Sequence, residues 1–227
     1  MVTRRVVVGM LLAVGLAAGC SSTEEAPGGL PDAAQVLREA AEASKTISSA
    51  HFTLKVNGSV SAIPVQEADG DLTREGSAKG TVKLTLMGNL FDGEFVLVDD
   101  GLYIKGPTGG WQQLPAALTS SLYDPSAILD PARGVPHVLA NLKDARTEAR
   151  EDVGGESAFK VTGTATQQDV SGLVPGVTGD TRLTVWVSEE TKRPVKASVE
   201  LAGEGEPATV DLTLSDVDVP VTVTPPA

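Results

Sequence analysis

The sequence predicts an α+β protein: one large curved antiparallel sheet, a half-barrel, with short helices over its concave apolar face. Three observations support this prediction. Apolar and polar residues alternate in seven short segments, as in strands that bury one face and expose the other. Turn dipeptides such as Asn57-Gly58 and Gly154-Gly155 separate these segments. One longer helical pattern precedes all of the predicted strands.

The predicted helix runs from about Ala33 to Thr46. Pro31 and Asp32 precede it and act as a start signal, because proline fits the first turn and aspartate caps it. The side chains expected to face the sheet recur at helical spacing. They are Ala33, Val36, Leu37, Ala40, Ser44 and Ile47.

The strands follow from alternation with a period of two. We expect them at residues 51–56, 81–86, 91–97, 159–162, 182–187, 195–201 and 210–215. Four further dipeptides are interpreted as turns between them: Asp69-Gly70, Gly88-Asn89, Asp100-Gly101 and Gly109-Gly110.

The middle of the chain interrupts the sheet. Residues 115–133 indicate a loop with short helical turns near 126–129, and residues 134–142 indicate a short helix. Another short helix is expected within 165–174, followed by a loop over 173–180. The irregular part around 123–131 is either a lid over a pocket or a surface loop.

The N-terminus has the form of an export signal followed by a tether. Arg4 and Arg5 precede an apolar run over 6–18, which fits a signal peptide and is short for a transmembrane helix of about 20 residues. The run leads to Cys20, the only cysteine, after small residues that a lipoprotein signal peptidase accepts. We therefore expect residues 1–19 to be removed and the Cys20 sulfur to carry a diacylglyceryl anchor. The alternative is an ordinary signal peptide with a chance cysteine.

The remaining chain indicates a flexible tether over 20–30 and a single domain over 31–227. Without residues 1–19 there are 208 residues, with 16 Lys and Arg against 30 Asp and Glu, a net charge of −14. This charge disfavours nucleic acid as a partner and keeps an exported domain dispersed. A lone cysteine also excludes an intramolecular disulfide and a cysteine-based zinc site.

The apolar face of the predicted sheet is larger than its predicted cover. The cover consists of one alanine-rich helix and shorter turns. A sheet of this size curls, because long twisted sheets do not stay flat. We infer that the sheet curves around a hydrophobic cavity; a fully packed α+β core is the alternative.

No pattern in the sequence indicates catalysis. His51 and His137 have no cysteine or histidine at ligand spacing, so packed or surface positions are expected for both. The aspartate pairs within 69–71 and 99–100 suit acid–base chemistry or calcium, but each lies on a turn signal, where aspartate is common. No nucleophile elbow, zinc motif or phosphate loop occurs. We expect no enzymatic activity, no metal and no cofactor.

Several short segments share an order and spacing with a known family over nearly all of the mature chain. They are Leu30-Pro31-Asp32-Ala33, Ser49-Ala50-His51, Val56-Asn57-Gly58, Gly70-Asp71-Leu72-Thr73, the run Gly80 to Leu86, Tyr123-Asp124-Pro125, the run Val138 to Leu142, and Val185-Trp186. None of them is a catalytic motif. Together they resemble the mycobacterial LppX/LprAFG-type lipoproteins.

This resemblance implies a half-barrel that encloses a large apolar cavity for multi-acylated lipids and glycolipids. Phosphatidylinositol mannosides, lipoarabinomannan and triacylglycerides are examples of such ligands. It implies carriage between the inner membrane and the outer layers of the envelope, with a major-facilitator transporter as partner in one branch of the family. The loops at 106–114 and 174–180 differ from the family pattern, which leaves the choice of lipid open.

We expect a monomeric lipid carrier, anchored through Cys20 to the extracytoplasmic side of the cell membrane, with cell-wall and released forms left open. Acyl chains are expected to lie against eight apolar side chains. They are Val82, Leu84, Leu86, Phe95, Leu97, Val138, Leu139 and Leu142. The alternative is a scaffold lipoprotein with a solid core that partners an envelope transporter.

Overall fold

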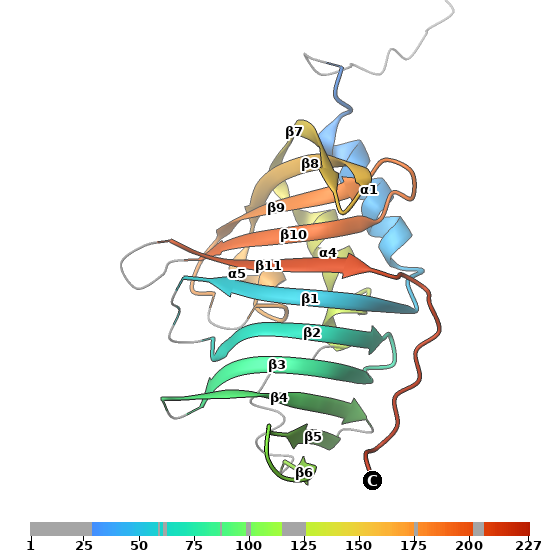
Figure 1. Ribbon diagram of the computed structural model, residues 1–227. Helices are drawn as coiled ribbons and strands as arrows, with labels where there is room; N and C mark the ends of the chain where they lie inside the picture. Colours follow the sequence, from blue (N-terminus) through green and yellow to red (C-terminus); the bar gives the residue numbers. More distant parts are fainter. Residues whose placement is uncertain are drawn as a thin grey trace, which may run out of the picture.

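The structure is a computed structural model that describes residues 29–58, 60, 63–86, 88–98, 101–114, 126–174, 177–201 and 207–227. Its main element is an eleven-stranded sheet whose strands follow the order β6-β5-β4-β3-β2-β1-β11-β10-β9-β8-β7, with every neighbouring pair antiparallel. Figure 1 shows the strands stacked as a ladder with the helices behind them. The predicted class, α+β with one large antiparallel sheet, is confirmed.

The strands are β1 Ser49–Asn57, β2 Val65–Thr73, β3 Ala78–Leu86, β4 Asn89–Val98, β5 Gly101–Lys105, β6 Gln112–Gln113, β7 Lys143–Val153, β8 Glu156–Ala165, β9 Thr181–Ser188, β10 Pro194–Leu201 and β11 Ala208–Ser215. The helices are α1 Ala33–Ser44, α3 Ser126–Leu129, α4 Val135–Asn141 and α5 Gln167–Val170. Each of the seven predicted strands coincides with one of these strands, but the prediction omits β2, β5, β6 and β7. Within the described ranges, no helix is both long and apolar enough to cross a bilayer.

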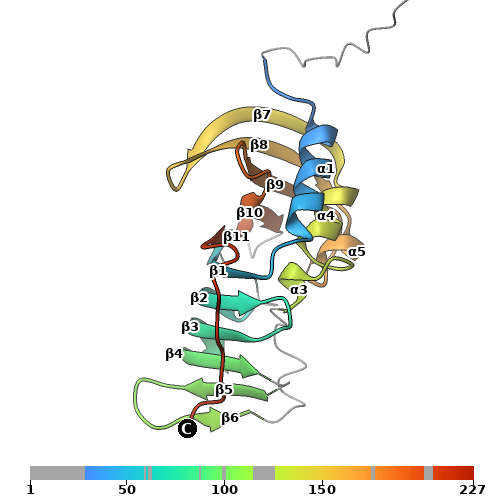
Figure 2. The same ribbon diagram turned by 90° about the vertical axis from the view of Figure 1, so that its right-hand side faces the viewer.

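All four described helices lie on one side of the sheet, which curls around α1 and α4 at its β7–β8 end (Figure 2). The carboxylate of Asp32 caps α1 by accepting a hydrogen bond from the backbone N–H of Gln35 at 2.9 Å. The helix buries one face and packs against α4. Its buried residues are Ala33, Val36, Leu37, Ala40, Ala41 and Ser44. Because four of these six side chains are alanine or serine, α1 covers the sheet with little bulk.

Strand β2 corrects the prediction of a turn at Asp69-Gly70. Both residues lie inside β2, where Gly70 pairs with Phe52 of β1 and with Gly80 of β3. A Cβ on Gly70 would lie 2.2 Å from the carbonyl oxygen of Lys79, and one on Gly80 would lie 2.0 Å from that of Asp69. Only glycine allows so close an approach of the two backbones.

Two apolar clusters join the helices to the sheet. The first connects α1, α3 and α4 with β1, β2, β3, β8, β9 and β11, and the second connects α4 and α5 with β8, β9, β10 and β11. Members of the first include Leu37, Phe52, Ile128, Leu139 and Val185, and members of the second include Val138, Val170, Leu183, Val199 and Val210. Each fully buried side chain of this kind contributes about 1.5–3 kcal/mol to folding, so both clusters hold the helices firmly on this half of the sheet.

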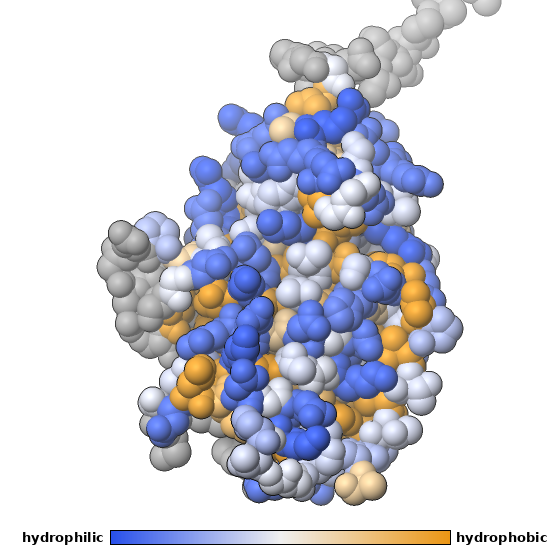
Figure 3. All heavy atoms as spheres, in the orientation of Figure 1, coloured by the Kyte–Doolittle hydropathy of each residue, from blue (hydrophilic) through white to orange (hydrophobic). Residues whose placement is uncertain are grey.

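The other face of the sheet is convex and carries mostly hydrophilic side chains (Figure 3). Orange, hydrophobic spheres follow its right-hand border, where Figure 1 places the C-terminal tail. The tail comprises residues 216–227, which follow β11 and run past the ends of β1 to β4. The ammonium of Lys79 in β3 donates to the carbonyl of Thr222 at 3.0 Å, so the tail is also attached to β3.

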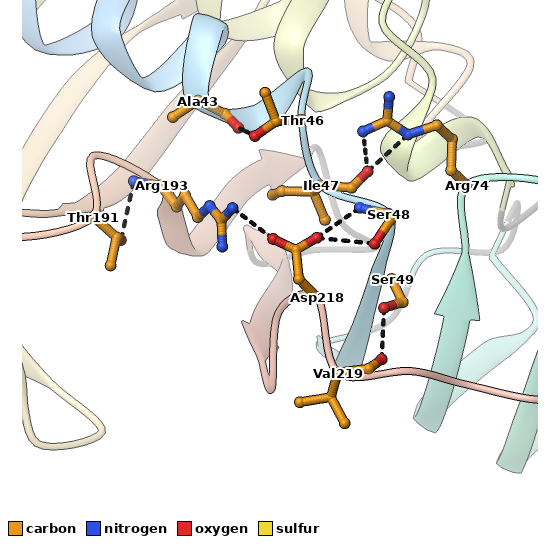
Figure 4. A network of polar contacts seen from close by, with 10 residues as sticks. All are labelled: Ala43, Thr46, Ile47, Ser48, Ser49, Arg74, Thr191, Arg193, Asp218 and Val219. Atoms are coloured by element: carbon orange, nitrogen blue, oxygen red, sulfur yellow. Dashed lines mark hydrogen bonds and ion pairs between the residues drawn. The ribbon is translucent and has the colours of Figure 1, made fainter.

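A polar network fixes the start of this tail beside the junction of α1 and β1 (Figure 4). The Asp218 carboxylate accepts hydrogen bonds from the Ser48 backbone N–H at 2.8 Å, the Ser48 hydroxyl at 3.0 Å and the Arg193 guanidinium at 2.6 Å. These contacts, the Ser48 backbone first, hold the pKa of Asp218 below its ordinary value. On the other side of the junction, Arg74 donates to the carbonyl of Ile47. The segment that leads from the covering helix into the sheet is thereby held from both sides.

Candidate functional site

The concave face of the sheet is a continuous apolar surface, because paired strands place their apolar positions in register. Residues directly opposite one another in a ladder point to the same face. One row of such pairs crosses nine strands, from β7 to β4. It consists of Thr147, Val161, Val185, Ala197, Leu212, Leu54, Ala68, Val82 and Gly93. Eight of the nine are apolar or glycine, so this face presents hydrocarbon across most of the sheet.

A parallel row on the same face contains a stretch without side chains. Here Phe52, Gly70, Gly80 and Phe95 are successive partners across β1, β2, β3 and β4. Phe52 is buried and Phe95 is half-buried, and the two glycines between them leave the sheet bare. The short helix α3 packs against β2. On this half of the concave face, the surface between the two aromatic rings is therefore formed by backbone atoms.

The eight predicted lining residues lie on two parts of the fold. On the sheet, Val82 is buried at 9% exposure, whereas Leu84, Phe95 and Leu97 are half-buried on the same face. Leu86 lies in β3, but its side chain is outside the described residues. On the helical layer, Val138 and Leu139 of α4 are buried and Leu142, at the end of α4, is half-buried.

The structure brings some of these residues together and not others. Phe95, Leu97, Leu139 and Leu142 all pack in or against the first apolar cluster. Val138 belongs to the second cluster, and Leu142 packs against both. Neither cluster includes Val82 or Leu84. Leu142 therefore occupies the junction between the two groups.

Three leucines at this junction stay partly exposed although apolar clusters lie on both sides of them. Leu54, Leu142 and Leu173 each pack against both clusters, yet all three are only half-buried. Leu142 lies directly on β8, since a Cβ on Gly163 would be 2.7 Å from its Cγ. Side chains between two packed clusters are ordinarily buried, so the clusters do not close over these three. Sequence reasoning missed Leu54 and Leu173 as site residues, although the alternation of β1 already placed Leu54 on the apolar face.

A small pocket, here called the α1 pocket, lies between α1 and the β8–β9 part of the sheet. Its volume is about 190 Å³. Its lining comes from Pro31, Gln35, Val36, Glu39, Phe159, Val187 and Lys192. Ligand pockets for whole small molecules usually measure about 300–1,000 Å³, so this one does not hold a complete multi-acylated lipid.

Each histidine lies within hydrogen-bond distance of an aspartate carboxylate. His137 Nε2 lies 2.9 Å from Asp169 Oδ1 and so links α4 to α5. The hydroxyl of Thr166, and after it His137, holds the pKa of Asp169 below its ordinary value. His51 pairs with Asp71 across β1 and β2 on the convex face, away from the apolar surface. Among the residues that the structure describes, no cluster of three or more histidine, cysteine, aspartate or glutamate side chains is arranged to hold a metal.

Several sequence predictions fall on residues that the structure does not describe. They are the signal segment 1–19, Cys20, most of the tether, the aspartate pair at 99–100, and the part of the irregular segment up to 125. Asp69 and Asp71, expected on a turn, instead lie on β2, where both face His51. This is a second consequence of the omission of β2 from the prediction.

The chain is similar to lipoproteins over nearly its whole length. A family model for LppX_LprAFG lipoproteins matches residues 32–223. The lipoarabinomannan carrier protein LprG of Mycobacterium leprae is 35% identical over 219 residues, which cover 94% of this chain and 91% of that protein. The LprG protein of Mycolicibacterium smegmatis is 37% identical over 223 residues, which cover 95% and 92% of the two chains.

Solved structures agree with the fold. The crystal structure of LprF from Mycobacterium bovis matches with a TM-score of 0.77 and 26% identity, over 86% of this chain and 97% of that one. The crystal structure of LppX from Mycobacterium tuberculosis matches with a TM-score of 0.65 and 24% identity, over 85% and 98% of the two chains. Fold, length and sequence agree, and the chain belongs to the LppX_LprAFG lipoprotein family.

Proposed function

We propose that the protein is a lipid carrier that holds acyl chains between the concave face of its sheet and its helices. The observation that carries this proposal is the partial exposure of Leu54, Leu142 and Leu173 between two apolar clusters. Hydrocarbon that remains uncovered between two packed layers is suited to contact with a hydrocarbon ligand. The relatives named as lipoarabinomannan carriers support the same function.

The physical basis of carriage is the balance between two apolar environments. An acyl chain that leaves a bilayer loses about 0.8 kcal/mol for each CH₂ exposed to water. Contact with the apolar row through Leu54 and Val82 restores this amount, so transfer from membrane to protein is nearly neutral. Loading and release can then both occur without a chemical energy source acting on the protein itself. Polar head groups remain at the opening, in contact with water.

The proposed cargo is a multi-acylated lipid or glycolipid, such as a phosphatidylinositol mannoside, lipoarabinomannan or a triacylglyceride. We further propose that the mature chain begins at lipidated Cys20, with residues 20–30 as the tether and residues 31–227 as one lipid-binding domain. The domain then works as a monomer on the extracytoplasmic side of the cell membrane, with a major-facilitator transporter as partner. Replacement of Cys20 by serine is expected to release the protein from membranes, which fractionation measures.

The test of the carrier proposal is extraction of the purified mature protein with organic solvent, followed by mass spectrometry. Acyl lipid is expected in the wild type. Val82→Trp is expected to abolish it, because Ala68 and Gly93 flank Val82 in the row and leave lateral room for an indole on the concave face. Thr81→Trp is the matched control, since Thr81 is exposed on the adjacent, convex-facing position.

The outcomes of this experiment distinguish the proposed carrier site from the scaffold alternative. Full lipid loading of Val82→Trp contradicts the proposed site. Absence of lipid from the wild type, together with unchanged partner binding in Val82→Trp, supports a scaffold lipoprotein with a solid core in place of a carrier.

A further inference from the structure

The α1 pocket has a different lining from the proposed acyl-chain site, although Val36, Phe159 and Val187 belong to the first apolar cluster. None of its seven lining residues is among the eight predicted to contact acyl chains. The pocket lies under the N-terminal half of α1. Phe159 and Val187, which pair with each other across β8 and β9, form its base. This pair is the next one on the same face after the pair of Val161 and Val185. Together with Val36 of α1, Phe159 and Val187 give the pocket an apolar floor.

The mouth of the pocket carries one cation, the ammonium of Lys192. Lys192 lies on the turn between β9 and β10 with φ at 59°, a left-handed conformation. Among the described residues, its ammonium makes no hydrogen bond and no ion pair within 4 Å, although its charge helps to lower the pKa of Glu189. Nearby, the Glu39 carboxylate accepts a hydrogen bond from the neutral Gln35 amide at 2.9 Å, and Arg150 forms an ion pair with Glu189 at 2.5 Å.

We propose that the α1 pocket is a second binding site, for a single-chain anionic amphiphile such as a medium-chain fatty acid. The volume of about 190 Å³ accommodates one short aliphatic chain, which packs against Val36, Phe159 and Val187. The anionic head meets the ammonium of Lys192, which makes no ion pair within 4 Å among the described residues. A charge-assisted contact of this kind selects the anion over neutral or cationic amphiphiles of the same chain length.

Calorimetric titration of delipidated mature protein with decanoate tests the proposal. Lys192→Asn is expected to weaken decanoate binding about 10-fold, as loss of one charge-assisted contact would, and asparagine tolerates the left-handed backbone. Lys192→Arg is expected to retain binding. Lys55→Asn removes one positive charge from an exposed position on β1 and serves as the control for net charge. Equal affinities of Lys192→Asn and Lys55→Asn overturn the proposal.

The chemistry of the head group gives an independent check. Decanol and decyltrimethylammonium are expected to bind more weakly than decanoate, because Lys192 favours an anion. Decyltrimethylammonium binding as tightly as decanoate would assign the mouth to Glu39 and overturn the proposal.

Two further variants separate this site from the carrier site. Gln35→Trp is expected to cover the pocket and abolish decanoate binding, whereas Ala34→Trp, at an exposed neighbouring position, leaves it unchanged. Val82→Trp is expected to retain decanoate binding even as it loses extracted acyl lipid. Loss of decanoate binding in Val82→Trp with retention in Gln35→Trp would place decanoate in the acyl-chain site and refute a second site.

Discussion

The imidazole of His51 bridges two carboxylates of the neighbouring strand. Its Nδ1 lies 2.9 Å from Asp71 Oδ1, and its Nε2 lies 3.4 Å from Asp69 Oδ2. Burial opposes protonation, but the hydrogen bond to Asp71 is the larger effect, and the pKa of His51 is raised above its ordinary value of 6.5. The pair therefore ties β1 to β2 most strongly when the ring is protonated.

This pairing makes part of the stability depend on pH. Because the pKa is raised in the folded protein, the stabilisation is fully present below about pH 6.5, the value for an unfolded histidine, and is lost as pH rises through the folded pKa. His51→Gln is expected to destabilise by about 0.5 kcal/mol at pH 5.5 and by less at pH 8.5, since exposed ion pairs are weak. Urea unfolding at the two pH values measures this. Lys55→Gln, on the same strand, should show no such difference; a pH-independent effect of His51→Gln would contradict the assignment.

The glycine pair in β2 and β3 predicts a large effect of one methyl group. In Gly70→Ala the new Cβ would meet the carbonyl oxygen of Lys79 at 2.2 Å, so the strands must move apart. We expect a loss of about 2–3 kcal/mol in the free energy of unfolding. At Gly110 no atom lies within 4 Å of an added Cβ, so Gly110→Ala should change the free energy of unfolding by much less than Gly70→Ala. The two urea midpoints give the comparison, and equal midpoints would show that the strands tolerate a side chain.

The Asp218 carboxylate is one of several groups that attach the C-terminal tail near β1, beside the Ser49 hydroxyl, which donates to the Val219 carbonyl at 2.6 Å. Asp218→Asn replaces the charged acceptor of Ser48 and Arg193 with a neutral one, and we expect about 1 kcal/mol of lost stability at neutral pH. The lowered pKa of Asp218 means that its contribution is complete above about pH 4 and is lost only as pH falls through the folded value. Hydrogen exchange of the tail amides measures the effect, with Asp216→Asn as the control on the same exposed segment. Equal exchange in the two variants would show that other contacts hold the tail.

A buried threonine hydroxyl near the edge of the sheet makes no hydrogen bond within the described part of the chain. Thr147 Oγ1 is buried without a hydrogen-bond partner among the described residues. Thr147→Val keeps the shape and removes the unpaired group, so we expect stabilisation of about 1 kcal/mol. Thr162→Val is the matched control on the adjacent strand, because the Thr162 hydroxyl donates to Glu148 at 2.6 Å and its removal should not stabilise. Thermal unfolding of the two variants distinguishes them, and a lower midpoint for Thr147→Val would indicate a partner for its hydroxyl.

Two of the missed strands, β2 and β7, share one physical feature: most of their inward side chains are small. In β2 the concave-facing residues are Ala68, Gly70 and Leu72, and in β7 they include Ala145 and Thr147. A search for alternating large apolar residues passes over such strands, although β2 pairs with β1 and β3 and β7 pairs with β8. The signal that β2 does carry is the alternation of Glu67, Asp69 and Asp71 with these small residues, which marks its wet face. The prediction instead interpreted Asp69-Gly70 as a turn, because that dipeptide is common in both settings.

The face on which each strand residue lies was predicted better than the way in which strands and helices come together. Alternation correctly assigned Val82, Leu84, Phe95 and Leu97 to the apolar face, because a period of two decides the face of each side chain. The ladder registers that align Leu54 with Val82, and the seating of Leu142 on Gly163, arise from contacts distant in sequence. No local pattern contains them, and the same holds for the α1 pocket.

Leu139 of α4 and Leu142 at the C-terminal end of α4 are expected to respond differently to truncation to alanine. Leu139 is 3% exposed and packed in the first cluster, so Leu139→Ala is expected to destabilise the delipidated protein by about 3 kcal/mol. Leu142 is half-buried between the clusters, so Leu142→Ala should lose only about 1 kcal/mol, because fewer contacts disappear. Urea unfolding measures both.

Substitutions of Leu142 should also change the amount of bound lipid, with opposite effects of a smaller and a larger side chain. Leu142→Ala enlarges the space between the clusters and is expected to retain extracted acyl lipid, whereas Leu142→Trp fills that space and should lose it. Ala140→Trp, on the exposed side of α4, controls for the added indole. If Leu142→Ala is as damaging as Leu139→Ala and Leu142→Trp still carries lipid, then the clusters are closed around Leu142 and acyl chains bind elsewhere.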